Sequence, residues 1–295
     1  MKVAAAAYPL DVLKNWQAYE DKMASWVREA ATAGAELLVF PEYGAMELAT
    51  LAGLEVAGDL EGSLHAVAER LAQADAIHAA LAREHGVHIL AGSGPAAGDP
   101  RPVNRARLIT PEGVVAEQDK QIMTPWERDP WDVAPGGPLH LFDTDLGRIG
   151  VLICYDCEFP LLGRALVEAD VLLIPSCTET LAGYWRVRLG AQARAMENQC
   201  FTVMSSLVGE ADWSEAVETN TGAGGIFCPP DVGLPADGVM AVGQIGQPGW
   251  TFAELDFAAT AHVRERGGVR NRAHWDDQTP RHQSVTSLSL RAKHP

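Results

Sequence analysis

Two cysteines stand three residues apart in the segment GVLICYDCEFP, residues 150–160, which begins with an apolar run typical of a buried strand. Cys154 and Cys157 could form a redox pair, contribute half of a zinc site, or be one nucleophile beside an unrelated cysteine. A redox pair needs a helix N-terminus that lowers a thiol pKa, zinc needs further ligands, and a nucleophile needs a base or a cation.

The surroundings of the pair favour a single nucleophile, Cys154. The predicted helix 159–168 starts after both cysteines, so neither thiol lies on its first turn. A structural zinc site takes about four ligands, and the chain has no second CxxC or HxxxH at suitable spacing. We interpret Cys157 as a small apolar residue close to the site.

Two charged residues that follow other apolar strands could assist such a thiol. Glu42 follows the strand in AELLVFPEYG, and Lys120 follows VVAEQ in VVAEQDKQIM. Catalytic groups collect at the carboxyl ends of strands in α/β sheets. Lys120 is also the only lysine between residues 22 and 293 in an arginine-rich chain. Taken singly, a helix-capping glutamate and a lysine placed there by chance remain open alternatives.

Apolar runs alternate with helix-period segments along most of the chain, which predicts an α/β fold with a mixed sheet. The expected helices are 15–33, 62–86, 159–168 and 184–198. Irregular stretches at 121–138 and 207–224 are long for connectors, and long ordered loops are frequently functional. We expect one domain, residues 1–270, followed by a tail, residues 271–295, that packs on the domain or on a partner subunit.

The amino-acid composition limits the classes of molecule that this protein could bind. The 295 residues carry a formal net charge of -16, which argues against nucleic acid or an anionic membrane as the main partner. No apolar run reaches the length of a membrane span, and five cysteines make an odd count for a disulfide framework. We expect a cytoplasmic protein. The segment GSGPAAG lacks the lysine and helix of a phosphate-binding loop, so we expect no nucleotide, and no cofactor or metal is predicted.

The order of FPEYG, a lysine after a later strand, and GVLICYDCEFP resembles the nitrilase superfamily of carbon–nitrogen hydrolases. The resemblance runs from KVAAAAYPL to WTFAELD and includes RLGAQARAMENQCFTV. It implies an α-β-β-α sandwich that pairs with a second copy, helix layer to helix layer, as a homodimer or higher homo-oligomer.

The same resemblance implies roles for individual residues. Glu42, Lys120 and Cys154 match the catalytic triad, and Glu127 in TPWERDPW matches a second glutamate near it. The backbone N–H of Tyr155 would complete an oxyanion site. The implied reaction is hydrolysis of a small-molecule amide, a non-peptide carbon–nitrogen bond, through a cysteine thioester. Nitrilase, N-carbamoyl hydrolase and acyl-transfer activities, or a non-catalytic role, remain alternatives, although CYD is similar to amidase branches and nitrilases usually carry CWE there.

Side chains near the triad positions could line the substrate pocket, with ordinary packing as the alternative for each. Aromatic residues suit pocket walls, and a cysteine–threonine pair follows the strand LLIPS in LLIPSCTET. The candidates are Tyr43, Trp126, Cys177, Thr178 and Tyr184, with Trp131 and Trp185 as further aromatics.

Overall fold

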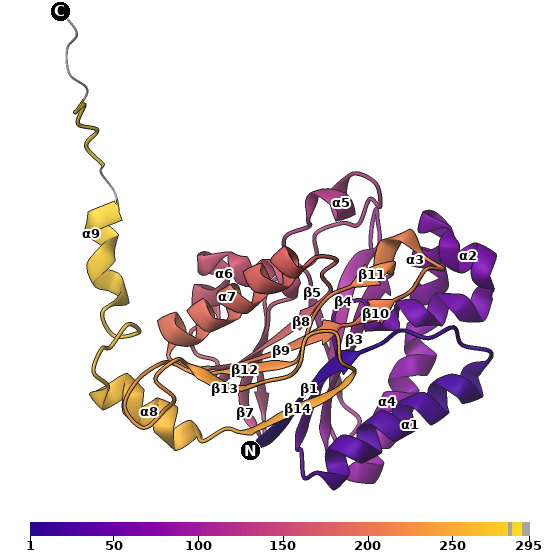
Figure 1. Cartoon of the computed structure of the whole chain (residues 1–295), viewed down its shortest axis with the longest axis horizontal. Helices are drawn as coiled ribbons and strands as arrows, with labels where there is room; N and C mark the ends of the chain where they lie inside the picture. Colours follow the sequence, from indigo (N-terminus) through magenta and orange to yellow (C-terminus); the bar gives the residue numbers. More distant parts are fainter. Residues whose placement is uncertain (283–284, 291–295) are drawn as a thin grey trace, which may run out of the picture.

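Two half-sheets joined at one pair of strands form the centre of the computed structural model, which describes residues 1–282 and 285–290 (Figure 1). The first half-sheet contains β5 (Val115–Asp119), β4 (Val103–Ile109), β3 (His88–Ala96), β2 (Leu37–Val39), β1 (Lys2–Tyr8) and β14 (Gly249–Glu254). The second contains β6 (Leu141–Thr144), β7 (Gly147–Val151), β8 (Val171–Ser176), β9 (Phe201–Leu207), β12 (Gly225–Phe227) and β13 (Val239–Val242). They join where Ala7 and Tyr8 of β1 pair in parallel with Ser206 and Leu207 of β9.

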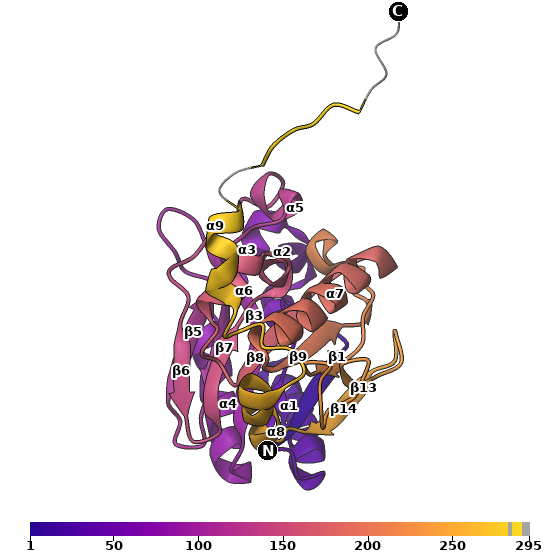
Figure 2. The same ribbon diagram turned by 90° about the vertical axis from the view of Figure 1, so that its left-hand side faces the viewer.

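Helices cover the outer face of each half-sheet, which gives the α-β-β-α sandwich predicted from the resemblance (Figure 2). α1 (Trp16–Thr32) and α4 (Leu71–His85) cover the first, and α6 (Pro160–Ala165) and α7 (Leu181–Asn198) cover the second. The remaining described elements are η1 (Gly44–Ala52), α2 (Leu54–Gly58), α3 (Leu60–Ala68), α5 (Pro125–Arg128), η2 (Cys154–Glu158), β10 (Gly209–Glu210), η3 (Glu215–Val217), β11 (Thr219–Asn220), α8 (Phe257–Arg266), η4 (Trp275–Gln278) and α9 (Thr279–His282).

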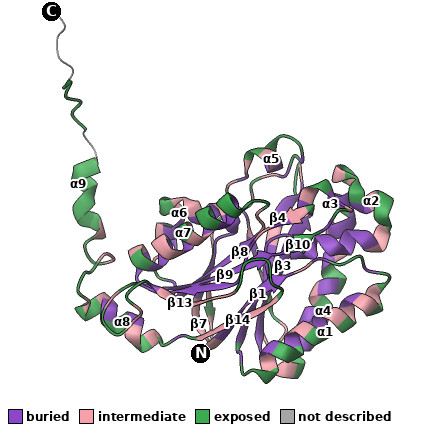
Figure 3. Cartoon of the chain, in the orientation of Figure 1, coloured by how far each residue is buried: buried purple, intermediate pink, exposed green. Residues whose placement is uncertain are grey.

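β1 shows why the sequence forms two packed layers. Its side chains alternate, so Ala4, Ala6 and Tyr8 join the core under α1 and α4, whereas Val3 and Ala5 face the core shared with the second half-sheet. Both faces of this strand are buried (Figure 3), which explains an apolar run without polar alternation. The burial of both faces places the strand at the centre of the sandwich.

The predicted helices 15–33 and 159–168 agree with α1 and α6 apart from their ends. The expected helix 62–86 is two helices in the structure, because a turn at Glu69 and Arg70 separates α3 from α4. α7 starts three residues earlier than expected, since the Thr180 hydroxyl caps it by accepting a hydrogen bond from the Gly183 N–H at 3.1 Å. The irregular stretches 121–138 and 207–224 contain only short elements, among them α5 and η3.

The segment after α8 contacts the helix layer of the second half-sheet before α9 extends away from it (Figure 1). The Arg164 guanidinium of α6 stacks on Trp275 at 4.4 Å, and the Gln199 side chain accepts a hydrogen bond from the Arg272 backbone N–H. Within the tail, residues 283–284 and 291–295 lie outside the described residues, and contact with a partner subunit stays a prediction. No helix among residues 1–282 and 285–290 is both long and apolar enough to cross a membrane.

Candidate active site

The three strands that precede Glu42, Lys120 and Cys154 end at the same edge of the sandwich. β2 and β5 point the same way in the first half-sheet, because β5 and β3 are both antiparallel to β4 and β3 is parallel to β2. β7 shares that direction through the parallel ladders of β8, β9 and β1. The three side chains therefore line one cavity of about 480 Å³, although they are far apart in the sequence.

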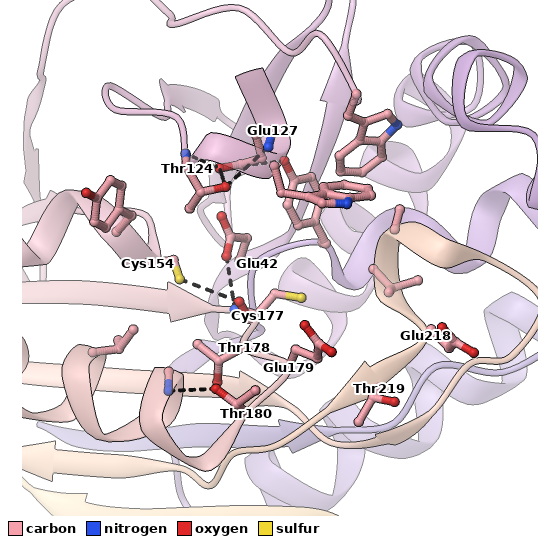
Figure 4. A pocket seen from close by; sticks show the side chains of 18 of the residues that line it. Glu42, Thr124, Glu127, Cys154, Cys177, Thr178, Glu179, Thr180, Glu218 and Thr219 are labelled. Atoms are coloured by element: carbon pink, nitrogen blue, oxygen red, sulfur yellow. Dashed lines mark hydrogen bonds between the residues drawn. The ribbon is translucent and has the colours of Figure 1, made fainter. Parts of the chain in front are cut away.

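Cys154 is the first residue of the 3₁₀ helix η2, not the last residue of a strand as its sequence context indicates. Its backbone has a φ of 50°, in the left-handed region that non-glycine residues seldom adopt and that costs free energy. The thiol is 5% exposed and faces the carbonyl oxygen of Cys177, with Sγ and O 3.6 Å apart (Figure 4). The first N–H groups of η2, including that of Tyr155, open the helix and have no earlier carbonyl within it to bind.

Lys120 lies between two buried carboxylates. Its Nζ donates to Oε1 of Glu42 at 2.7 Å and to Oε1 and Oε2 of Glu127 at 2.8 and 2.7 Å. The three side chains are at most 4% exposed, so neither their charges nor their hydrogen bonds are screened by bulk water. The geometry brings together the three charged residues that the sequence analysis singled out.

These contacts shift the pKa values of the two glutamates in opposite directions. Burial, opposed by Lys120 and assisted by Glu127, raises the pKa of Glu42 from 4.5 to about 7. Burial also acts on Glu127, but the charge of Lys120 and hydrogen bonds from Lys120, Tyr43 and Thr124 outweigh it and lower its pKa. Glu42 is therefore poised to exchange a proton near neutral pH, whereas Glu127 stays ionised as a fixed negative charge.

Glu127 is fixed by a capping box at the start of α5. The Thr124 backbone N–H donates to its Oε2 at 2.8 Å, and its own N–H donates to the Thr124 hydroxyl. The Tyr43 hydroxyl donates to Oε1 at 2.5 Å. With Lys120 as a third residue that donates hydrogen bonds to it, this carboxylate is held in place beside the lysine.

The thiol of Cys154 is a neutral group in this environment. Burial and the negative charge of Glu42 raise its pKa well above the usual value, and Lys120 only partly compensates. A nucleophilic thiolate must then form during reaction by transfer of its proton to a neighbouring base. Glu42 is the adjacent carboxylate, and its hydrogen bond with this thiol offsets a small part of the rise in its pKa.

Asp156 connects the lysine and cysteine segments, a role that the sequence analysis missed. Its carboxylate accepts backbone N–H bonds from Gln121 and Ile122, which follow Lys120, and from Ile153, which precedes Cys154. It is 1% exposed, and burial raises its pKa to about 6. An aspartate inside the otherwise apolar stretch GVLICYDC was the available signal, since a buried carboxylate needs partners.

Asn104 also escaped the sequence analysis. Its side-chain N–H donates to Oε1 of Glu42 at 3.0 Å, and its side-chain oxygen accepts from the Ser93 hydroxyl at 2.7 Å. The other carboxylate oxygen of Glu42, Oε2, accepts the backbone N–H of Cys177 at 2.9 Å. A single asparagine in a strand such as VNRARLI carries no distinguishing pattern.

The cavity brings together most of the predicted pocket residues. Tyr43, Trp126, Trp131, Cys177 and Thr178 line it, and the ring centroids of Tyr43 and Trp131 lie 4.9 Å apart. The structure places two other aromatics elsewhere. Tyr184 is not among the lining residues and is buried in the core beneath α7, and Trp185 is exposed on the surface of that helix.

The outer end of the cavity carries acidic side chains that the sequence analysis did not single out. Glu179, Glu215 and Glu218 line it and are exposed, and Figure 4 shows Glu179 and Glu218 on the side away from Glu127. Glu158 forms an ion pair with Arg186, whose Nε lies 3.6 Å from its Oε1. Glu215 and Glu218 belong to the long stretch 207–224, for which the sequence analysis expected a functional role because of its length.

Residues 1–282 and 285–290 contain no group of three or more histidine, cysteine or acidic side chains arranged to hold a metal ion.

The sequence of residues 2–244 matches the family model described as carbon–nitrogen hydrolase. The chain belongs to the carbon–nitrogen hydrolase family. Its fold is that of the nitrilase superfamily: the Nit3 protein of Saccharomyces cerevisiae superposes with a TM-score of 0.71 at 20% identity, covering 92% of this chain and 96% of that one. An amidase from Nesterenkonia sp. superposes with a TM-score of 0.63 at 22% identity, covering 95% and 96%.

Curated proteins resemble this chain at the sequence level. A probable hydrolase, YhcX of Bacillus subtilis, is 30% identical over 92% of this chain, which spans only 52% of that longer protein. Hydrolase Rv0480c of Mycobacterium tuberculosis is 31% identical over 82% of this chain and 85% of its own length. An (R)-stereoselective amidase of Pseudomonas sp. is 38% identical over 37% of the chain and 39% of its own length. Each of these relatives is named a hydrolase or an amidase.

Proposed function

We propose that this carbon–nitrogen hydrolase is an amidase that converts a small amide into a carboxylic acid and ammonia or an amine. One observation carries the proposal: a buried thiol lies beside a glutamate with a pKa of about 7, and a buried lysine binds that glutamate and a second, ionised one. This set supplies a nucleophile, a proton acceptor and a fixed positive charge within one cavity. The amidase-named relatives point to the same chemistry.

In the proposed reaction Cys154 attacks the amide carbonyl carbon while Glu42 accepts the thiol proton. The electron pair of the carbonyl moves onto its oxygen, which faces the ammonium of Lys120 and the backbone N–H of Tyr155. Loss of one such oxyanion donor typically costs about 3 kcal/mol, roughly a hundredfold in rate. Glu42 then protonates the leaving nitrogen, a thioester remains on Cys154, and water activated by Glu42 releases the acid.

The cavity restricts the substrate by size and charge. A volume of about 480 Å³ suits a small molecule and not a folded protein chain. Glu179, Glu215 and Glu218 at its outer end would repel an anionic substituent, because like charges in a partly desolvated cleft are unfavourable. We therefore propose amides whose outer portion is neutral or positively charged.

We also propose that the protein works as a homodimer or higher homo-oligomer in the cytoplasm. Apolar side chains are exposed on α6 and α7, the helix layer of the second half-sheet: Leu161, Leu181, Trp185, Leu189 and Met196. An exposed apolar face of this kind is typical of an interface between subunits. A reducing compartment would keep the Cys154 thiol free. Light scattering after gel filtration tests the assembly, and a monomeric mass would contradict it.

Ammonia release tests the reaction. Purified protein is assayed on aliphatic amides, ω-amides, N-carbamoyl compounds and nitriles beside Cys154→Ala, and intact-mass spectrometry follows the thioester. Activity on amides that the variant loses supports the proposal, whereas activity that persists in the variant contradicts the nucleophile assignment. Acyl transfer would appear as hydroxamate when hydroxylamine is added.

Fluoroacetamide gives a second test that needs no known substrate. A glutamate-to-glutamine mutant of the Nesterenkonia sp. amidase carries the acetamide moiety of this compound on its active-site cysteine. We expect the same adduct on Cys154 by peptide mapping. Labelling that is spread equally over all five cysteines would show that Cys154 is not activated.

A further inference from the structure

The two carboxylate oxygens of Glu42 have different partners. Oε1 accepts hydrogen bonds from Lys120 at 2.7 Å and from the Asn104 amide at 3.0 Å. Oε2 accepts the backbone N–H of Cys177 at 2.9 Å, and the carbonyl of that same residue is the partner of the Cys154 thiol. The backbone of Cys177 thus contacts both groups, Oε2 through its N–H and Sγ through its carbonyl oxygen (Figure 4). Oε1, by contrast, is occupied by two side-chain donors.

The orientation of the Asn104 amide follows from a chain of hydrogen bonds behind it. The Ser93 hydroxyl oxygen accepts the backbone N–H of Tyr43 at 3.1 Å, and its proton is donated to the amide oxygen of Asn104 at 2.7 Å. With its oxygen held by Ser93, the amide must present its N–H to Glu42. Ser93 and Asn104 are 0% exposed, so water cannot replace either partner.

We propose that Asn104 is a positioning residue that reserves Oε2 of Glu42 for proton transfer with Cys154. This inference rests on the proposed function, because it assigns the atom on which the base of that reaction works. As the S–C bond forms, the thiol proton passes to Oε2, and the same proton leaves on the amide nitrogen when the C–N bond breaks. Oε1 stays bound to Lys120 and Asn104 throughout, which keeps the carboxylate from rotating.

Loss of the amide donor should also change the proton affinity of Glu42. A hydrogen bond from a neutral N–H stabilises the carboxylate form, so its removal raises the pKa of the acid. The other groups that face Glu42 are unchanged by a substitution at residue 104: Lys120 at the end of β5, Glu127 on α5, Cys154 on η2 and Cys177 after β8.

The test is the pH dependence of Asn104→Leu beside the wild type. Two rates are measured: kcat/KM for the best amide of the panel, and alkylation of Cys154 by iodoacetamide, which needs no substrate. We expect the acid limb of both profiles to move up by about one pH unit and kcat to fall about tenfold with KM within about twofold, as for loss of one hydrogen bond to a charged group. An unmoved acid limb in a folded variant would overturn the proposal.

Asn198→Leu is the matched control. Asn198 is equally buried and donates its amide N–H to the Gly163 carbonyl at 2.7 Å, but it lies at the end of α7 and does not line the cavity. It should lower the melting temperature without moving either acid limb. If it moved the limb as far as Asn104→Leu does, the shift would reflect general destabilisation and the proposal would be wrong.

A second variant covers the case in which Asn104→Leu does not fold. Ser93→Ala frees the amide oxygen, so the amide can turn, and the acid limb should move in the same direction by a smaller amount. If the pH profile is normal for Ser93→Ala but shifted for Asn104→Leu, Asn104 positions Glu42 without help from the Ser93 hydroxyl.

Failure of the proposed function would give a different result. The wild type would then show neither hydrolysis nor preferred alkylation of Cys154, and the inference about Asn104 would fail with it.

Discussion

The inner and outer ends of the cavity are both rich in glutamate but differ in what surrounds each carboxylate. Glu42 and Glu127 at the inner end are at most 3% exposed, and their oxygens are hydrogen-bonded to Lys120, Asn104, Thr124 or neighbouring backbone. Glu179, Glu215 and Glu218 at the outer end are exposed to solvent.

The difference teaches that one residue type performs two tasks according to its burial. Inside, low polarity makes each charge contact strong and separates the pKa values of two neighbouring glutamates. At the outer end, water screens the charges of the glutamates. These charges therefore affect the binding of a substrate as it enters the cavity and not the bond that is broken. Substitutions at the inner end should therefore change kcat, and those at the outer end should change KM.

The largest effect is expected for Cys154→Ser. Replacing the nucleophile should lower kcat/KM by about 10⁴-fold or more, in line with loss of a covalent catalyst. Ammonia release and intact mass measure the loss of turnover and of the acyl adduct. Cys228→Ala, at a buried cysteine that does not line the cavity, is the control and should keep the adduct. A serine variant within tenfold of wild type would contradict the assignment.

Lys120→Met should be nearly as damaging and should also destabilise the fold. Without the ammonium, Glu42 and Glu127 repel one another and one must bind a proton, so kcat should fall by about 10²- to 10³-fold. Breaking a buried ion pair from one side costs about 3–5 kcal/mol of unfolding free energy.

The double variant Lys120→Met/Glu127→Gln separates the two effects. Removing the second charge relieves the repulsion, so urea unfolding should show a recovery of stability over Lys120→Met. Activity should stay low, because the positive charge is still missing. Recovery of kcat in the double variant would show that Lys120 serves the fold and not the reaction.

The pH dependence gives the third comparison. Because burial raises the pKa of Glu42 to about 7, kcat/KM should rise about tenfold per pH unit below that value and level off above it. Stability should move oppositely: the folded state binds more protons than the unfolded state between the unfolded value of 4.5 and about 7, so the free energy of unfolding falls as pH rises through this window.

The variant Glu42→Gln isolates the contribution of Glu42 to the pH dependence of the free energy of unfolding. Asp156, with a pKa of about 6, adds a slope of the same sign, and it is present in both proteins. Urea unfolding at several pH values should therefore show a shallower decline for the variant than for the wild type. Equal slopes would mean that Glu42 does not hold its proton in the folded state.

The smallest effects belong to the outer end. Glu179→Gln/Glu218→Gln should raise KM for a cationic amide by about two- to fivefold and lower it for a carboxylate-bearing one, with kcat unchanged, because exposed charge contacts are worth under about 1 kcal/mol each. Added salt should reduce the difference between the two proteins. A change confined to kcat would show that the outer glutamates act on the reacting bond, which would remove the distinction between the two ends.

The sequence by itself determined the α/β organisation and pointed to candidate catalytic residues, and the family resemblance of its motifs implied the sandwich. Continuous apolar runs predicted the main strands and period-3.6 patterns predicted the helices, because the burial of apolar side chains follows backbone geometry. Glu42, Lys120 and Cys154 were found because each follows an apolar run, and strands that share a direction end at one edge of a sheet. Their catalytic roles remain predictions for the experiments above.

Only the tertiary structure decided which further polar residues complete the site. Asn104 contacts Glu42 62 positions away, Ser93 contacts Tyr43 50 positions away, and Asp156 contacts Ile122 34 positions away. No local sequence pattern records such contacts. The same holds for Tyr184, an aromatic on α7, because other residues of that helix line the pocket while the Tyr184 side chain is buried in the core. The raised pKa of Glu42 is likewise a tertiary property, because it arises from burial and from the nearby charge of Glu127, which Lys120 only partly offsets.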